Sequence, residues 1–125
     1  MTRKNYKILV IDDEPDLVNT IKTRLEWNKY DVETASNGQE GLEKTASVFP
    51  DLILLDCNMS VMSGLKMLEL LRQDKKLKNI PVIMLTAVSE PYDIDAAGLL
   101  GVADYVTKPF NFTLLLEKIS QILDK

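Results

Sequence analysis

Asp51-Leu52-Ile53-Leu54-Leu55-Asp56 is the stretch that decides the fold, because four consecutive apolar residues stand between two carboxylates. A strand that is apolar at every position has no face left for water, which is typical of a parallel strand covered by helices on both sides. A second run of this kind, Val82-Ile83-Met84-Leu85, ends at Thr86. The two runs predict the centre of a parallel β-sheet.

Strand and helix patterns alternate along the rest of the chain. Strands are predicted at residues 6–11, 30–35, 51–56, 80–86 and 102–107, and helices at 15–28, 37–47, 63–73, 91–100 and 111–124. The strand at 30–35 alternates apolar and polar residues, which suits an edge strand. The alternation of strands and helices predicts an α/β fold with a doubly wound parallel sheet, and we expect residues 1–125 to form one domain.

Composition limits what the chain can bind. Its net charge of −4 argues against direct binding to nucleic acid or to an anionic membrane. The sequence has no histidine and a single cysteine, Cys57, so histidine metal ligands and an intrachain disulfide are excluded. No apolar stretch is long enough to span a membrane and the first residues lack a signal sequence, so we expect a cytoplasmic protein.

Polar residues stand at the ends of four predicted strands: Asp12 and Asp13, Asp56, Thr86, and Lys108. The carboxyl ends of parallel strands meet at one edge of the sheet, where open α/β sheets hold their ligands. Three carboxylates, a hydroxyl and an ammonium there predict a site for a phosphoryl group and a divalent cation, either Mg²⁺ or Mn²⁺. Two plainer interpretations stay open, namely Asp56 as a capping residue after its strand and Asp12-Asp13 as caps of the next helix.

Four sequence elements carry a family resemblance, and they follow one another along nearly the whole chain. They are Val10-Ile11-Asp12-Asp13-Glu14; Leu54-Leu55-Asp56 followed by Met59, Met62 and Gly64; Leu85-Thr86-Ala87; and Asp104-Tyr105-Val106-Thr107-Lys108-Pro109-Phe110. The chain resembles the receiver domain of response regulators in two-component signalling, the chemotaxis regulators among them. The resemblance implies a flavodoxin-like receiver fold, with five parallel strands in the order 2-1-3-4-5.

The resemblance implies that Asp56 is a phosphoacceptor. The phosphoryl group would come from a phosphohistidine on a histidine kinase or on a histidine phosphotransfer protein. Mg²⁺ would be held by Asp13, Asp56 and the backbone carbonyl of Asn58, with Asp12 acting mainly through a bound water.

The resemblance also assigns roles at the other strand ends. Lys108 and Thr86 would bind oxygens of the phosphoryl group, and Ala87 would leave room for it. A cis peptide bond before Pro109 would aim Lys108 into the site. Thr86 and Tyr105 would form the switch, because Thr86 moves toward the phosphoryl group and Tyr105 turns inward behind it.

The implied output surface comprises the helix at 91–100, the strand at 102–107 and the helix at 111–124. It would contact a downstream effector domain or protein, or a second copy of the chain in a homodimer that forms on phosphorylation. The chain would carry the phosphoryl group on its own side chain and would not be a turnover enzyme. Two positions depart from the family pattern, Ser60 where a proline is usual and Pro91 near the start of a helix.

Functions of other classes remain as alternatives. A degenerate receiver would act only as a protein-interaction module, but all five expected site residues are present. An aspartyl-phosphate phosphatase of the haloacid-dehalogenase type needs a second acid two residues after its nucleophile, where this chain has Asn58. A flavodoxin-like FMN carrier needs a loop rich in glycine and hydroxyl groups, where this chain has Asp12-Asp13-Glu14-Pro15.

Overall fold

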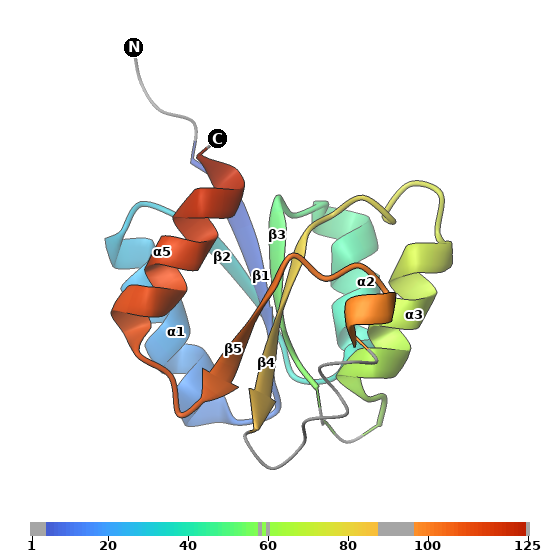
Figure 1. Cartoon of the computed structure of the whole chain (residues 1–125), viewed down its shortest axis with the longest axis horizontal. Helices are drawn as coiled ribbons and strands as arrows, with labels where there is room; N and C mark the ends of the chain where they lie inside the picture. The colour runs from blue at the N-terminus through green and yellow to red at the C-terminus, as the bar shows by residue number, and fades with distance from the viewer. Residues whose placement is uncertain (1–4, 58, 60, 88–96, 125) are drawn as a thin grey trace.

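A five-stranded parallel sheet runs through the centre of the computed structural model, which describes residues 5–57, 59, 61–87 and 97–124 (Figure 1). The strands stand in the order β2-β1-β3-β4-β5. Their bounds are β1 (Lys7–Ile11), β2 (Asp31–Ala35), β3 (Leu52–Asp56), β4 (Val82–Ala87) and β5 (Asp104–Lys108). The strand order confirms the predicted fold, and the alternating strand β2 lies at an edge of the sheet as expected.

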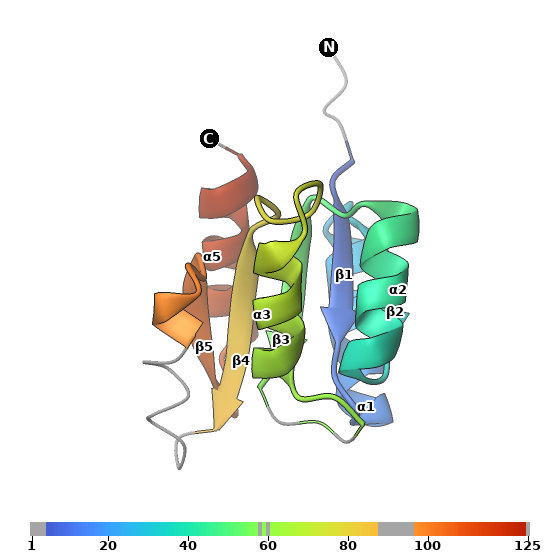
Figure 2. The ribbon, with the colours of Figure 1, turned by 90° about the vertical axis from the view of Figure 1, so that its right-hand side faces the viewer.

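Helices cover both faces of this sheet. α1 (Pro15–Trp27) and α5 (Phe112–Leu123) lie on one face, and α2 (Gly38–Val48) and α3 (Gly64–Gln73) lie on the other (Figures 1 and 2). These elements begin and end within two residues of the predicted boundaries. The helix predicted at 91–100 falls mostly outside the described residues, and residues 97–99 are helical.

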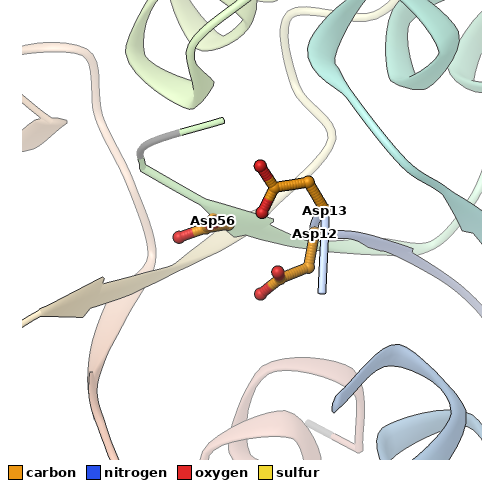
Figure 3. Close-up of side chains that lie close together, drawn as sticks. All are labelled: Asp12, Asp13 and Asp56. Atoms are coloured by element: carbon orange, nitrogen blue, oxygen red, sulfur yellow. The ribbon is translucent and has the colours of Figure 1, made fainter. Parts of the chain in front are cut away.

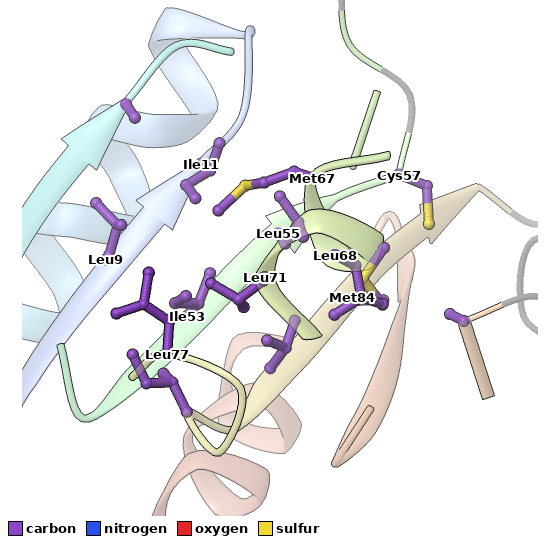
Figure 4. Packing of buried hydrophobic residues seen from close by; sticks show 14 residues of the cluster. Leu9, Ile11, Ile53, Leu55, Cys57, Met67, Leu68, Leu71, Leu77 and Met84 are labelled. Atoms are coloured by element: carbon purple, nitrogen blue, oxygen red, sulfur yellow. The ribbon is translucent and has the colours of Figure 1, made fainter. Parts of the chain in front are cut away.

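The central strand β3 contributes to two separate hydrophobic cores. Ile53 and Leu55 pack under α3 (Figure 4), whereas Leu52 and Leu54 pack under α1 and α5. All four side chains are fully buried. Successive side chains of a strand point to opposite faces, so burial on both faces requires an apolar residue at every position.

Three of the helices begin at a residue whose side chain caps the first turn. Asn37, Ser63 and Asn111 accept hydrogen bonds from backbone N–H groups at the start of α2, α3 and α5. α1 differs, because its N-cap residue is Glu14, which makes no side-chain cap, and Pro15 opens the helix. Neither Asp12 nor Asp13 is therefore the N-cap residue of α1, although Asp12 Oδ1 accepts a 3.0 Å hydrogen bond from the backbone N–H of Glu14.

The register of the strands brings distant residues to one edge of the sheet. Ile11 of β1 stands opposite Leu55 of β3, so Asp12 comes level with Asp56. Ala87 of β4 stands opposite Lys108 of β5. The polar residues at the carboxyl ends of β1, β3, β4 and β5 therefore lie at the same edge of the sheet. None of the helices among the described residues has the length and apolar character needed to cross a membrane.

Candidate functional site

Three carboxylates meet at the carboxyl edge of the sheet (Figure 3). One oxygen each of Asp12, Asp13 and Asp56 lies within 4.8 Å of the others. Asp12 is 1% exposed and Asp56 is 7% exposed, whereas Asp13 faces solvent. Buried carboxylates this close together repel one another unless positive charge is brought to them. The cluster is therefore stabilised by a nearby cation.

Lys108 supplies one positive charge. Its Nζ lies 2.8 Å from Asp12 Oδ2, 3.3 Å from Asp56 Oδ1 and 3.3 Å from Glu14 Oε1. Burial of the ammonium favours its neutral form, but the hydrogen bond to Asp12 and the charges of the carboxylates outweigh this effect and raise the pKa of Lys108. Lys108 is therefore a cation at neutral pH.

The remaining negative charge fits a hard divalent metal ion. The donors are carboxylate oxygens, which Mg²⁺ and Mn²⁺ prefer over softer metals. Asp13 and Asp56, with Asp12 beside them, could hold such an ion, while one ammonium balances only part of their charge. The acidic triad is thus consistent with a divalent metal site. Asn58, whose carbonyl was expected to be a further ligand, lies outside the described residues.

Thr86 presents a buried hydroxyl at the same edge. Its side chain is fully buried, and Oγ1 has no hydrogen-bond partner among the described residues. A buried polar group without a partner costs about 1–3 kcal/mol, so such a group calls for an explanation. Leu85, the residue before Thr86, stands opposite Asp56 in the sheet. A ligand carried by Asp56 is therefore in a position to satisfy this hydroxyl.

The other predicted residues surround this centre. The Lys108–Pro109 peptide bond is cis, as expected from the resemblance. Tyr105 is half-buried and packs against the core that contains α3, and Ala87 is the last residue of β4. Ser60 and Pro91, the two departures from the family pattern, lie outside the described residues.

Two residues of the site have roles that were not predicted. Glu14 contacts Lys108, which is 94 positions away in the chain. Gly64 packs so closely on the end of β3 that a Cβ atom there would lie 1.9 Å from the backbone oxygen of Asp56. The place of Glu14 directly after the acid pair is a signal that it lies near the site, but nothing in the sequence pairs it with Lys108.

Comparison with known families gives one match over most of the chain. The family described as "Response regulator receiver domain" matches residues 8–120. The chain is 41% identical over 119 residues to the alkaline phosphatase synthesis transcriptional regulatory protein PhoP of Bacillus subtilis (strain 168), which covers 95% of this chain and 49% of that protein. It is 40% identical over 116 residues to the hybrid signal transduction histidine kinase D of Dictyostelium discoideum, covering 93% of this chain and 7% of that protein.

Solved structures agree with these matches. The chemotaxis response regulator CheY4 of Vibrio cholerae superimposes with a TM-score of 0.89 at 31% identity, covering 96% of this chain and all of that chain. By contrast, the chain spans about half the length of the Bacillus relative and a small part of the Dictyostelium one. Similarity to these two larger proteins therefore concerns one portion of each.

Proposed function

Because the chain belongs to the response regulator receiver family, whose members are phosphoacceptors in two-component signalling, we propose that Asp56 is the residue that accepts the phosphoryl group. The position of Asp56 on the central strand carries this proposal. It lies between the acid pair that follows β1 and the hydroxyl of Thr86 on β4, for which the described residues offer no hydrogen-bond partner. Asp12 also contacts Lys108, but β3 separates its strand from Thr86.

The reaction is a transfer from a nitrogen atom to an oxygen atom. An oxygen of the Asp56 carboxylate forms a bond to phosphorus while the N–P bond of a phosphohistidine breaks, and the electrons of that bond return to the imidazole. Lys108 binds one phosphoryl oxygen and Thr86 donates a hydrogen bond to another, so both stabilise the charge that the transfer distributes over these oxygens. The phosphoryl group stays on the chain, which is why a receiver is not a turnover enzyme.

A divalent metal ion completes this site. We assign Mg²⁺, with Mn²⁺ as its substitute, to Asp13, Asp56 and the backbone carbonyl of Asn58, with Asp12 acting through a water. The supporting observation is the set of hard oxygen donors with one ammonium for three clustered carboxylates. Bound there, the ion supplies positive charge to the phosphoryl oxygens and to Asp56.

The partner that delivers the phosphoryl group is a histidine kinase or a histidine phosphotransfer protein. A groove of about 500 Å³ beside Lys108 supports a docking place for it. The groove has apolar walls from Leu17, Phe110 and Phe112, and the guanidinium of Arg24 lies 4.6 Å from the ring centre of Phe112. A helix that carries the phosphohistidine and lies in this groove brings the histidine close to Asp56.

The output is a change of surface after phosphorylation. Thr86 moves toward the phosphoryl group and Tyr105 turns inward, which alters the face formed by the helix predicted at 91–100, β5 and α5. This face binds a downstream effector domain or protein, or a second phosphorylated copy of the chain. Residues 1–125 act as one receiver unit in the cytoplasm.

Phosphorylation by a small donor tests the assignment of Asp56. Protein is incubated with Mg²⁺ and acetyl phosphate, and the intact mass is measured. We expect one phosphoryl adduct on the wild type and none on Asp56→Asn. Asp51→Asn changes the acid at the opposite end of the same strand, where it accepts a hydrogen bond from the Lys7 backbone N–H, and should keep the adduct.

Two results would contradict the assignment. An undiminished adduct on Asp56→Asn would move the acceptor to another residue. An unmodified wild type would favour a receiver that acts only as a protein-interaction module.

A further inference from the structure

Gly98 leaves a space that the hydroxyl of Tyr105 uses. A Cβ atom placed on Gly98 would lie 2.9 Å from Tyr105 Oη, closer than carbon and oxygen atoms normally approach. Gly98 belongs to the helical residues 97–99, and Tyr105 belongs to β5. We call the space left by the missing side chain the Gly98 gap. Any other residue at this position would compete with Tyr105 for it.

The helical side of the Gly98 gap is held in place. Ala97 is fully buried in the core under α3. Immediately after the gap, the guanidinium of Arg72 on α3 donates hydrogen bonds of 2.8 Å to the Leu100 carbonyl and 3.3 Å to the Gly101 carbonyl. The Arg72 guanidinium also donates hydrogen bonds to the carbonyls of Lys78 and Ile80 before β4. Arg72 therefore links α3 both to the segment before β4 and to residues 100–101. These contacts hold residues 97–101 against α3.

Tyr105 approaches the Gly98 gap with the end of its side chain. Its hydroxyl is at the end of a side chain that turns about two single bonds, and the residue is half-buried. Tyr105 stands opposite Met84 in the sheet, and Thr107 stands opposite Thr86. Side chains two positions apart on a strand point to the same face, so Tyr105 and Thr86 share one face of the sheet. A displacement of the Tyr105 ring therefore changes the packing on the face of the sheet that carries Thr86.

We propose that Gly98 is a positioning residue that accommodates Tyr105 in the position it occupies here and thereby sets how readily the chain switches. The proposal rests on the proposed function, in which Tyr105 leaves this position when Asp56 is phosphorylated. A methyl group in the Gly98 gap disfavours the form in which the hydroxyl lies there, because the Tyr105 side chain must shift. The equilibrium then shifts toward the switched form, because a population shift follows the difference in free energy between the two states.

The first test uses Gly98→Ala without any phosphate donor. NMR spectra of protein with labelled tyrosines report the Tyr105 ring, whose signals are identified by their loss in Tyr105→Phe. We expect these signals to shift in Gly98→Ala and to stay in place in Leu99→Ala, which changes a neighbouring side chain that is 91% exposed. Gly98→Ala should fold, because alanine favours a helix over glycine. Unchanged Tyr105 signals would overturn the proposal.

The second test asks whether the effect passes through the hydroxyl. Gly98→Ala should speed the formation of the phosphoryl adduct with acetyl phosphate by about two- to tenfold, as expected for a modest population shift. In a Tyr105→Phe background the same substitution should have no such effect, because phenylalanine has no oxygen in the Gly98 gap. An unchanged or slower rate, or an equal change in both backgrounds, would overturn the proposal.

The two tests separate this inference from the function on which it rests. The NMR signals of the Tyr105 ring are measured without phosphorylation, so they test only whether a side chain at Gly98 displaces Tyr105. A wild type that takes up no phosphoryl group would overturn the proposed function and with it the switching role of Gly98. Normal adduct formation with unchanged ring signals would overturn the role of Gly98 and leave the proposed function standing.

Discussion

Lys108 is shared among three carboxylates, those of Asp12, Asp56 and Glu14. Its shortest contact is to the fully buried side chain of Asp12, and its contacts to Asp56 and Glu14 are longer. If Asp56 carries the phosphoryl group, as proposed, new anionic oxygens come within reach of the same ammonium. Lys108 would then exchange part of its pairing with Asp12 for pairing with the phosphoryl group, which would link the chemistry on β3 to β1 and β5.

Val61 provides a prediction about a single residue. Its backbone φ is 70°, in the left-handed region, and its side chain is 81% exposed. A β-branched residue in this region loses about 1–2 kcal/mol, whereas glycine adopts it without that loss. Val61→Gly should therefore raise the free energy of unfolding, by about 0.5–1 kcal/mol after the greater chain entropy of glycine is subtracted.

Urea unfolding monitored by circular dichroism checks this value. Val61→Ala is the matched control, because it shortens the side chain but keeps a Cβ atom and hence most of the penalty. A Val61→Gly protein that is less stable than the wild type would show that the side chain of Val61 stabilises the loop through contacts.

Among the elements, the junction of β3 and α3 bears most directly on the acceptor residue. The N–H of Gly64, the first residue of α3, donates a 2.8 Å hydrogen bond to the Cys57 carbonyl directly after Asp56. The first turn of α3 thus packs on the end of the central strand. This packing fixes the backbone that carries Asp56.

Gly64→Ala should disturb this junction. The new Cβ atom would lie 1.9 Å from the Asp56 backbone oxygen, so strand and helix must separate. We expect the free energy of unfolding to fall by about 1–3 kcal/mol, although alanine in a helix is intrinsically better than glycine by about 1 kcal/mol.

The midpoint of urea unfolding measures this loss. Lys66→Ala serves as control, because Lys66 is exposed in the same turn of the helix. A Gly64→Ala protein as stable as the wild type would mean that the junction relaxes without loss.

The boundaries of the elements were largely predictable from the sequence. Apolar runs marked β3 and β4, and the 3.6-residue periodicity marked α1 and α5, because burial imposes these patterns locally. The close approach of α3 to β3 was not predictable. The sequence places Gly64 at the start of the helix predicted at 63–73, and only the packed structure brings it against Asp56.

For the whole molecule, we expect the acidic cluster to lower stability when no metal ion is bound. Three carboxylates with an oxygen each within 4.8 Å repel one another, and Lys108 offsets only part of their charge. Asp13→Asn removes one of these charges and should raise the melting temperature in EDTA. A ligand that binds only the folded state stabilises it, by about 2.7 kcal/mol at a hundredfold excess over its dissociation constant. Asp13→Asn should lose most of this gain in MgCl₂.

Melting curves with EDTA and with MgCl₂ test both effects. Asp16→Asn is the control, because Asp16 is an exposed acid in the first turn of α1 and lies outside the cluster. A full Mg²⁺ gain in Asp13→Asn would remove Asp13 from the metal site.

Sequence alone determined the parallel sheet, its central strand and the kinds of polar groups at the strand ends. These properties follow from local patterns, since a strand buried on both faces must be apolar throughout and polar residues can follow only where it ends. Tertiary structure alone decided which groups touch. The pairing of Lys108 with Asp12, 96 positions away, depends on strand register and on rotamers, as does the meeting of Tyr105 with Gly98. The same holds for Thr86 Oγ1, which has no hydrogen-bond partner within the part of the chain that the structure describes. Such distances arise only after every element has packed, so no local pattern of residues encodes them.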